Sequence, residues 1–266
     1  MTSLDEAFRS VRKDIEQSQS IPDDLAYFNL HERRFRHAAE RIAELVSPGA
    51  EILDIGGHYL HFSAILSRLG FRVTAIDVSA HAELPFVVER AARMNVSLSP
   101  VDDRGFPEGV FLESEANRFE AVIFCEILEH ITFNLVAFWQ RVRELVRPGG
   151  IIYVTTPNAL KLLSVLGAFW NLVSLRRIGL RVEQILKTPT FGHHWKEYSS
   201  SELVQYFSRV SPDFRVAVRK VSYGSPDADV KRQLGSIRTG LLTLGNATGF
   251  FADNLEAVVT VGAKTP

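Results

Sequence analysis

Hydrophobic residues occur along this chain in short apolar runs that alternate with amphipathic segments of helical period. The pattern is clearest in residues 50–79, where a five-residue apolar run precedes Gly56-Gly57. Apolar positions then recur at helical spacing up to Gly70, and a second apolar run, residues 71–76, ends at Asp77. Such runs are typical of buried strands, and glycine commonly ends a helix. The stretch therefore predicts a strand, a glycine turn, a helix and a second, parallel strand.

The same alternation continues to the end of the chain. Further strands are predicted at residues 95–101, 119–125, 151–155, 214–221 and 255–261, with a turn at residues 147–150. Further helices are predicted at residues 4–15, 30–46, 80–94 and 134–146, and after a capping-box sequence that begins at Ser199. Alternating strands and helices form parallel sheets with helices on both faces. We therefore expect an α/β fold with a doubly wound, mostly parallel, seven-stranded sheet that closes with an antiparallel pair.

Two segments stand apart from this alternation. Residues 1–47 precede the first strand, so the predicted N-terminal helices are either a lid or packing for the sheet edge, and residues 48–266 form the main domain. Residues 159–190 are strongly apolar with scattered basic residues and are predicted to be a helical insertion after the fifth strand. Such an insertion would cover the substrate side and suit a bulky or lipid-like substrate, although a dimer face or plain core is equally compatible.

Composition narrows the class of protein. With 46% hydrophobic residues the chain can build a core, and its net charge of −1 provides no general attraction to nucleic acid or to anionic lipid. The single cysteine, Cys125, excludes an internal disulfide and suits a reducing compartment. Neither a signal peptide nor a transmembrane run is visible, so we expect a soluble, cytoplasmic protein.

The first glycine turn is the candidate ligand site, because open α/β sheets bind ligands at the carboxyl ends of their strands. Gly56 permits a close approach of backbone to ligand, and Asp77 at the end of the second strand would accept two hydrogen bonds from vicinal hydroxyls. A nicotinamide dehydrogenase would also place an acid about twenty residues after the turn. Its G-x-G-x-x-G fingerprint is absent here, so that alternative is set aside.

At three places the sequence resembles the class I S-adenosylmethionine-dependent methyltransferases, which have a Rossmann-like fold. The blocks are ILDIGG, VTAIDVS, and FCEILEHI followed by RPGGIIYVTTPN, and HHWKEYSSSEL resembles a block that often follows them. The resemblance implies that S-adenosylmethionine is the cofactor. The residues that it implies for cofactor binding are Asp54, Gly56, Gly57, Asp77, Val78, Asp103 and Cys125, with Asp102 as the alternative to Asp103 for the adenine amino group.

The glycine turn departs from this family pattern. Family members typically carry two further glycines where this chain has His58 and Leu60. A Cβ at either position narrows the approach to the cofactor, so the loop either binds it more weakly or follows another path. A catalytically inactive scaffold, built on the same fold but serving as a binding module, is therefore kept as an alternative.

A second candidate site follows the fourth strand. Glu126, Glu129 and His130 would share one face if the chain turned helical directly after the strand, and two carboxylates with an imidazole suit a divalent metal. The pattern resembles the small-RNA 2′-O-methyltransferases and the ubiquinone-pathway O-methyltransferases, which pair such a block with a later histidine that aligns with His194. The resemblance implies Mg²⁺ or Mn²⁺ on these four residues, holding the acceptor hydroxyls and lowering their pKa.

The metal-free alternative stays open, because a Leu-Glu-His block also resembles methyltransferases in which the glutamate only organises the turn. In either case His130 and His194 are the candidate catalytic residues, since an imidazole titrates near neutrality and suits deprotonation of a hydroxyl. We expect an O-methyltransferase acting on a small or lipid-linked hydroxyl compound, and nucleic acid is an unlikely partner. A metal-dependent RNA 2′-O-methyltransferase is the alternative, and a homodimer is left open.

Overall fold

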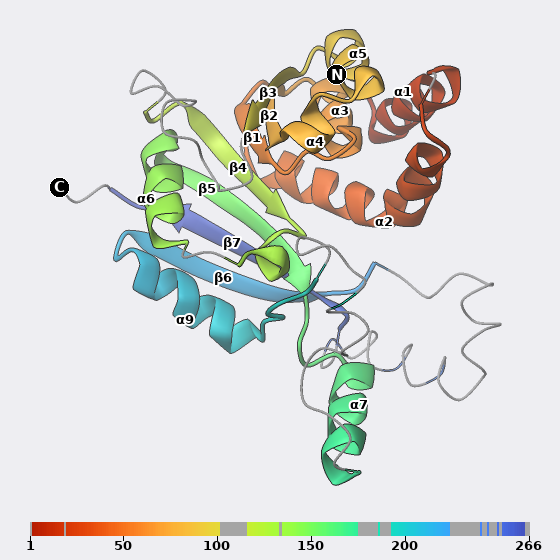
Figure 1. The fold of residues 1–266 in the computed structure, drawn as a ribbon. Helices are drawn as coiled ribbons and strands as arrows, with labels where there is room; N and C mark the ends of the chain where they lie inside the picture. The colour runs from red at the N-terminus through yellow and green to blue at the C-terminus, as the bar shows by residue number, and fades with distance from the viewer. Residues whose placement is uncertain are drawn as a thin grey trace. The chain divides into compact units, whose positions relative to one another are not determined.

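The computed structural model describes residues 2–18, 20–101, 116–132, 135–174, 193–223 and 252–263, together with positions 186, 240, 244 and 249. Its strands form one seven-stranded sheet in the order β3-β2-β1-β4-β5-β7-β6 (Figure 1). The sheet is mixed and mostly parallel, which confirms the predicted fold class. In the described part of the chain, no helix has the length and apolar character needed to cross a bilayer.

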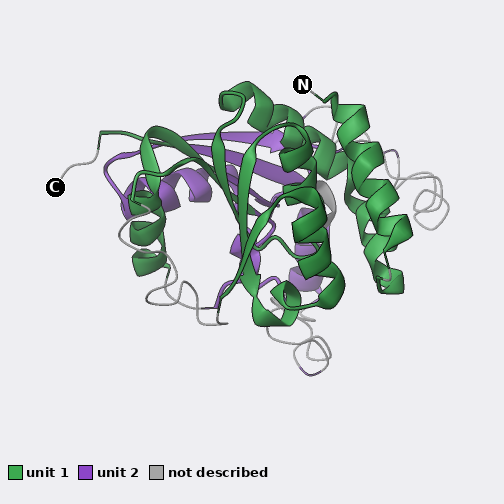
Figure 2. Cartoon of the chain, turned by 90° about the horizontal axis from the view of Figure 1, so that it is seen from above, with its two compact units in different colours: residues 1–124, 134–152, 260–266 green, residues 125–133, 153–259 purple. Residues whose placement is uncertain are grey.

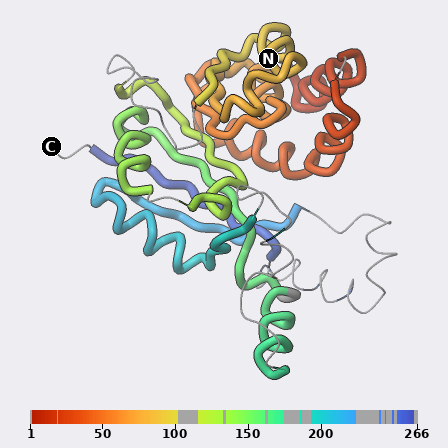
Figure 3. Tube along the Cα trace, viewed as in Figure 1, coloured from red at the N-terminus to blue at the C-terminus, as the bar shows by residue number. Residues whose placement is uncertain are grey.

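The strands and helices keep the alternation that the sequence predicts. The strands are β1 Glu51–Ile55, β2 Arg72–Val78, β3 Ser97–Val101, β4 Phe119–Cys125, β5 Val146–Pro157, β6 Phe214–Val221 and β7 Asn254–Val261. The helices are α1 Leu4–Gln17, α2 Pro22–Leu45, α3 His61–Arg68, α4 Ser79–Ala82, α5 Pro85–Met94, the 3₁₀ turn η2 Leu128–His130, α6 Val136–Leu145, α7 Leu162–Val173 and α9 Ser200–Val210. The tube in Figure 3 follows this order along the chain.

The chain divides into two compact units (Figure 2). The first comprises residues 1–124, 134–152 and 260–266, and the second comprises residues 125–133 and 153–259. In the first unit β1 lies between β2 and β4 and is parallel to both, with Asp54 opposite Ala75 and Ile123. Parallel strands end at the same edge of a sheet, so the residues after Ile55 and Cys125 leave the sheet at that edge.

The first unit has a core of aliphatic and aromatic side chains with its N-terminal helices packed on it. Ile52 and Leu53 of β1, Ile65 of α3 and Trp139 of α6 are fully buried. Helix α1 packs against α2 and α3, with an apolar face of Phe8, Val11 and Ile15 that is also buried. The N-terminal helices thus lie in the same compact unit as the first βαβ unit, and their role as a lid or as packing stays a prediction.

Two predicted helix boundaries are wrong, and both errors involve proline. Helix α2 begins at Pro22, not near residue 30, because a proline at the first helical turn needs no hydrogen-bonded N–H and opens a helix. The helix predicted over residues 80–94 is two helices, since Leu84 is extended and Pro85 begins α5. In both places the proline starts a helix.

The turn predicted at residues 147–150 is also wrong, because β5 runs through it. Gly149 has a φ of 81°, which its lack of a Cβ permits inside the strand. A Cβ on Gly150 would lie 2.9 Å from the carbonyl oxygen of Glu120, so this glycine serves close packing against the neighbouring backbone. The glycine pair that resembles a turn signal is therefore part of a strand.

The second unit contains the predicted helical insertion and the last two strands. Of residues 159–190, the structure describes α7, and most of the remainder lies outside the described residues, as do Asp102 and Asp103. Helix α9 begins with the predicted capping box, in which the Ser199 hydroxyl accepts from the Glu202 N–H and the Glu202 carboxylate accepts from the Ser199 N–H. Phe207 of this helix is fully buried in the unit.

Candidate functional site

The loop between β1 and α3 keeps a glycine-like backbone even where it lacks glycine. Gly56 has a φ of 76°, and His58 and Leu60 have φ values of 48° and 61°. A non-glycine residue in this left-handed region costs roughly 1–2 kcal/mol. A Cβ on Gly57 would lie 2.9 Å from Leu60 Cδ2, so the turn has no room for a larger residue there. The loop thus follows the glycine path despite two substitutions.

Asp77 is the acceptor around which this loop is arranged. Its Oδ2 accepts from the His58 N–H at 2.6 Å, and its Oδ1 accepts from the Val78 N–H at 2.7 Å. His81 Nδ1 lies 3.2 Å from the same Oδ1, and this hydrogen bond raises the pKa of the His81 imidazole. A carboxylate at the carboxyl end of β2 suits the ribose hydroxyls of a nucleoside ligand. The glycine loop beside it would let the protein backbone approach the rest of that ligand.

Asp54 is buried at the end of β1 and is hydrogen-bonded to the first turn of α3, and its role in cofactor binding stays a prediction. It is 4% exposed and accepts a hydrogen bond from the Ser63 hydroxyl at the start of α3. Burial, with the nearby charge of Asp77, raises the pKa of Asp54 to about 7. Among the other predicted cofactor residues, Val78 and Cys125 lie at strand ends and are partly buried, and Asp103 lies outside the described residues.

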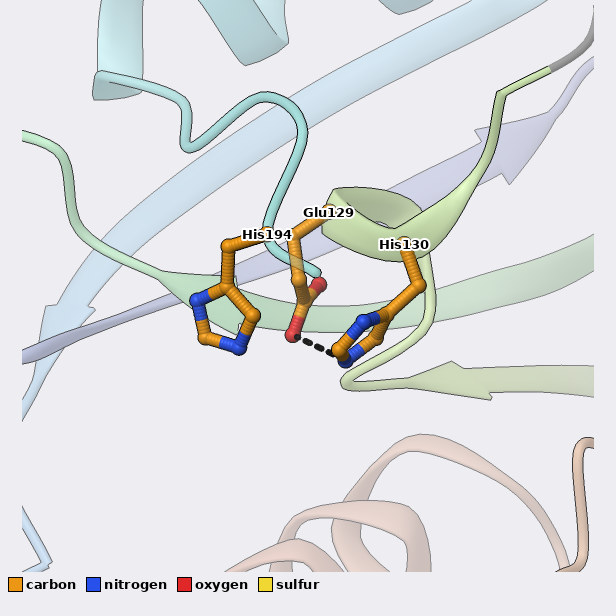
Figure 4. Close-up of side chains that lie close together, drawn as sticks. All are labelled: Glu129, His130 and His194. Carbon is orange, nitrogen blue, oxygen red and sulfur yellow. Dashed lines mark ion pairs between the residues drawn. The ribbon is translucent and has the colours of Figure 1, made fainter. Parts of the chain in front are cut away.

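A separate cluster in the second unit unites Glu129, His130 and His194. One ligand atom from each residue lies within 4.8 Å of those from the other two, and His130 Nε2 is 3.8 Å from Glu129 Oε1. Figure 4 shows the carboxylate between the two imidazoles, with Glu129 and His130 on η2 and His194 on the segment before α9. The backbone N–H of Trp195 donates to the carbonyl of Glu129 at 2.7 Å, so this segment is tied to η2.

The hydrogen bonds around the cluster determine which atoms face it. His130 Nδ1 is 3.1 Å from the carbonyl oxygen of His193, and because a carbonyl only accepts, Nδ1 carries the proton. His194 Nδ1 is 3.0 Å from Glu197 Oε1, which fixes its proton in the same way. Thr156 donates to Glu129 Oε2 at 2.9 Å. Because Nδ1 carries the proton in both imidazoles, Nε2 is the electron-pair donor atom that each contributes to the cluster.

The electrostatics of this cluster favour a cation. Glu129 is 1% exposed, and burial together with the charge of Glu126 raises its pKa to about 7. The hydrogen bond to Glu197 raises the pKa of His194. A buried carboxylate flanked by two Nε2 donors is a donor set that suits divalent ions, which would favour ionised Glu129. The residues present thus fit a divalent metal.

Glu126 differs from its expected position. Its φ of 55° is left-handed, and the helical turn that follows β4 covers residues 128–130, so the expected helical face shared by Glu126, Glu129 and His130 is wrong. The chain leaves the strand through a left-handed residue instead of starting a helix there. Glu126 is not among the residues whose ligand atoms meet in the described cluster, and its role as a ligand stays a prediction.

Comparison with known proteins identifies the family. A family model described as a methyltransferase domain matches residues 30–211, more than half of the chain. The chain belongs to this methyltransferase family. The expected class, the class I S-adenosylmethionine-dependent methyltransferases, is confirmed.

The methyltransferase is similar to ubiquinone biosynthesis O-methyltransferases. It is 30% identical to the mitochondrial protein of Rattus norvegicus over 163 residues, which cover 59% of this chain and 42% of the relative. It is 30% identical to the Caulobacter vibrioides protein over 166 residues, which cover 62% of this chain and 59% of the relative. The chain thus spans about half the length of these relatives.

Solved structures support the methyltransferase fold. A chain of the complex between the Haloferax volcanii Trm112 methyltransferase activator and a methyltransferase has a TM-score of 0.61 at 15% identity, covering 96% of this chain and 98% of that chain. A SAM-dependent methyltransferase from Archaeoglobus fulgidus has a TM-score of 0.52 at 16% identity, covering 88% and 99%. At these identities the likeness concerns the fold alone.

Sequence reasoning missed the residues that orient the methyltransferase's cluster. Thr156 lies at a predicted strand end, but nothing in its sequence context indicates a bond to Glu129. Glu197 stands three residues after His194, a spacing that permits the observed hydrogen bond and would have been a usable signal. The carbonyl of His193 carries no sequence signal, because every residue has one.

Proposed function

We propose that this methyltransferase transfers a methyl group from S-adenosylmethionine to a hydroxyl oxygen of a small or lipid-linked acceptor held at Glu129, His130 and His194. The observation that carries the proposal is the cluster itself: one ligand atom from each of the three residues lies within 4.8 Å of the other two, and Nε2 is the electron-pair donor of each imidazole. The similarity to enzymes named ubiquinone biosynthesis O-methyltransferases supports oxygen as the acceptor atom.

On the donor side, Asp77 would accept hydrogen bonds from the ribose hydroxyls of the cofactor. Gly56 and Gly57 would let the loop backbone approach the rest of it, and Asp54 would hold the loop through Ser63. Bound S-adenosylmethionine supplies an already activated methyl group on a sulfonium. The remaining tasks of the protein are to align the acceptor oxygen with that methyl group and to remove one proton.

On the acceptor side, Glu129 Oε1, His130 Nε2 and His194 Nε2 would hold a divalent ion, with Mg²⁺ or Mn²⁺ as candidates. Such an ion, when bound, lowers the pKa of a hydroxyl that it contacts. Glu197 and the His193 carbonyl keep the two imidazoles turned toward that ion, and Thr156 keeps Glu129 turned toward it.

In the metal-free form of the site, where Nε2 of His194 holds no ion, the proton of the acceptor hydroxyl needs a neighbouring acceptor. The hydrogen bond from His194 to Glu197 stabilises its imidazolium form, so His194 is suited to take up the proton of an acceptor hydroxyl. As the oxygen–carbon bond forms, the carbon–sulfur bond breaks and its electron pair stays on sulfur. The products are a methyl ether, S-adenosylhomocysteine and a proton on the base.

An apolar surface supports a lipid-linked acceptor within the same class. Helix α7 exposes Leu166, Phe169, Trp170, Leu172 and Val173, each by 47% to 64%. A helix that exposes this much apolar area commonly meets an apolar ligand or partner. An acceptor with an isoprenoid or acyl tail would suit such a surface.

The first test is a calorimetric titration with S-adenosylhomocysteine. We expect binding to the wild type and loss of binding in Asp77→Ala, whereas an unchanged affinity in that variant would place the donor elsewhere.

The second test is methyl transfer to a panel of catechols and phenols with and without EDTA. We expect activity that EDTA removes and Mn²⁺ restores. Turnover that EDTA does not reduce would contradict the proposed metal dependence. Absence of turnover on every hydroxyl acceptor would favour the catalytically inactive scaffold.

A further inference from the structure

The side chain of Arg90 is the most extensively bonded buried charge in the described part of the first unit. It lies on α5, is 0% exposed, and donates through Nε to Asp14 of α1 at 2.8 Å. Its two Nη atoms donate to the carboxylate of Asp24 on α2 at 3.0 and 2.6 Å. A buried guanidinium is stable only with such charged and polar partners, so Arg90 ties three helices together.

One further bond of Arg90 reaches the loop that precedes α3. Nη1 donates to the backbone carbonyl of Tyr59 at 2.7 Å. His61, the first residue of α3, has its Nε2 2.7 Å from Asp24 Oδ1, so the same carboxylate also holds the end of the loop. Carbonyl groups in turns usually bond to water or to nearby backbone, and a buried guanidinium is an unusual partner.

This contact completes a series of bonds along the loop. The Gly57 carbonyl accepts from the Leu60 N–H, the His58 N–H donates to Asp77, and the Leu60 carbonyl accepts from the Ala64 N–H. Tyr59 is the remaining residue, and Arg90 holds its carbonyl. The two left-handed residues, His58 and Leu60, flank Tyr59 directly. Fixing the carbonyl between them opposes relaxation of either residue to an ordinary conformation.

We propose that Arg90 is a positioning residue for methyl-donor binding, acting by fixing the Tyr59 carbonyl so that the loop at residues 56–60 keeps its left-handed path beside Asp77. The proposal rests on the assignment of the donor site to this loop and does not depend on the acceptor. A family glycine adopts this path without strain, whereas His58 and Leu60 do not. This clamp, the bond from Arg90 of α5 that Asp14 and Asp24 of the N-terminal helices hold in place, replaces what the glycines would provide.

The test compares two arginines that share a partner. Arg93 donates to the other oxygen of Asp14 at 2.6 Å and to Glu89 on its own helix, so Arg93→Lys disturbs the same carboxylate without removing the bond to Tyr59. Arg90→Lys keeps the charge but lacks the planar fork that bonds Asp14, Asp24 and Tyr59 together. We expect the dissociation constant of S-adenosylhomocysteine to rise at least tenfold in Arg90→Lys and less than twofold in Arg93→Lys.

Steady-state kinetics and amide exchange separate positioning from a purely structural role. We expect the KM for S-adenosylmethionine to rise in Arg90→Lys with kcat within about twofold, and amide exchange of residues 57–60 to accelerate while β1 stays protected. A variant that is less thermostable but binds S-adenosylhomocysteine like the wild type would overturn the proposal.

If Arg90→Lys does not fold, the wild type still provides a test. The clamp predicts that the His58 and Leu60 amides are already protected without ligand, as strongly as β1. Rapid exchange that slows only with S-adenosylhomocysteine would overturn it. Failure of the wild type to bind S-adenosylhomocysteine would instead remove the donor-site assignment, so the two failures are distinguishable.

Discussion

The buried carboxyl groups of this protein include two pairs whose pKa values shift in opposite directions. Asp14 and Asp24 face the guanidinium of Arg90, and their hydrogen bonds to cationic partners lower their pKa values despite burial. Asp54 and Glu129 face hydroxyl groups, of Ser63 and Thr156 respectively, and burial raises the pKa of each to about 7. The first pair supports the structure as charges, whereas the second pair lies at the candidate ligand sites.

Asp54 therefore gives a pH dependence of known sign. Its folded pKa of about 7 exceeds the ordinary value of 3.8, so the folded protein retains a proton that the unfolded chain releases. The resulting stabilisation is complete below about pH 4 and is lost as the pH rises to about 7, at up to about 1.4 kcal/mol per pH unit. Asp54→Asn lacks this dependence. We expect the free energy of unfolding of the wild type, minus that of Asp54→Asn, to fall between pH 5 and pH 7 in urea titrations.

Subtracting the free energy of unfolding of Asp54→Asn from that of the wild type removes the pH dependence that other titratable groups contribute. His31 and His58, whose pKa values burial lowers, are present in both proteins and cancel. A difference that stays constant between pH 5 and pH 7 would mean that Asp54 is ionised throughout and that Ser63 and the loop stabilise its charge.

Glu197 provides a residue-scale test of the cluster. It accepts the Nδ1 proton of His194, and loss of such an outer carboxylate typically weakens metal binding 10- to 100-fold. We expect a loss of this size in Glu197→Ala by Mn²⁺ titration, and a smaller one in Glu197→Gln, which keeps an accepting oxygen. Glu202→Gln removes the same charge nearby while keeping a capping-box residue, so it is the control and should bind Mn²⁺ like the wild type. Equal losses of Mn²⁺ affinity in all three variants would show that the net charge of the region, and not the hydrogen bond from His194 to Glu197, determines metal binding.

At the scale of elements, α9 links local stability to the cluster. The segment that carries His194 and Glu197 runs directly into its capping box. Ser199→Ala removes the hydroxyl that accepts from the Glu202 N–H, and we expect thermal unfolding to report a loss of about 1 kcal/mol. Ser200→Ala, one residue later, removes a hydroxyl outside the cap and should change stability by less than about 0.5 kcal/mol. Equal effects of the two substitutions would show that the cap is not the stabilising feature.

Elements whose signals are local were predictable from the sequence. The βαβ unit of β1, α3 and β2 and the capping box of α9 follow from apolar period and cap residues, and both are confirmed. Pro22 and Pro85 misled the prediction because proline both ends and begins helices, and only the packing of the following turn decides between the two.

The candidate sites were predictable only in part, because some of their features depend on contacts that the local sequence does not reveal. The sequence indicated that Glu129, His130 and His194 belong together, but a left-handed φ at Glu126 has no local signature in a residue that is neither glycine nor asparagine. Likewise, Arg90 lies on the buried face of α5, four residues from Phe86 and from Met94, but it is far along the chain from Asp14, Asp24 and Tyr59. Long-range bonds of this kind have no fixed spacing in the sequence.

At the scale of the whole molecule, the two candidate sites use different stretches of chain. The donor residues, from Asp54 to Val78, belong to the first unit, and the cluster of Glu129, His130 and His194 belongs to the second. Methyl transfer needs both ligands at once, yet each set of residues has its own hydrogen bonds within its own unit. Each ligand should therefore bind without the other.

This separation predicts two distinct footprints in hydrogen exchange. S-adenosylhomocysteine should slow exchange in residues 55–57 and 77–81, outside the loop amides that the clamp already protects, and Mn²⁺ should slow it in residues 126–131 and 193–199, because bound ligands protect the segments that hold them. Asp77→Ala should remove the first footprint alone, and His194→Ala the second alone. Protection by Mn²⁺ that persists in His194→Ala would mean that the ion binds elsewhere. The cluster would then be a hydrogen-bonded base site without metal, and the Nε2 of His194 would act directly on the acceptor hydroxyl.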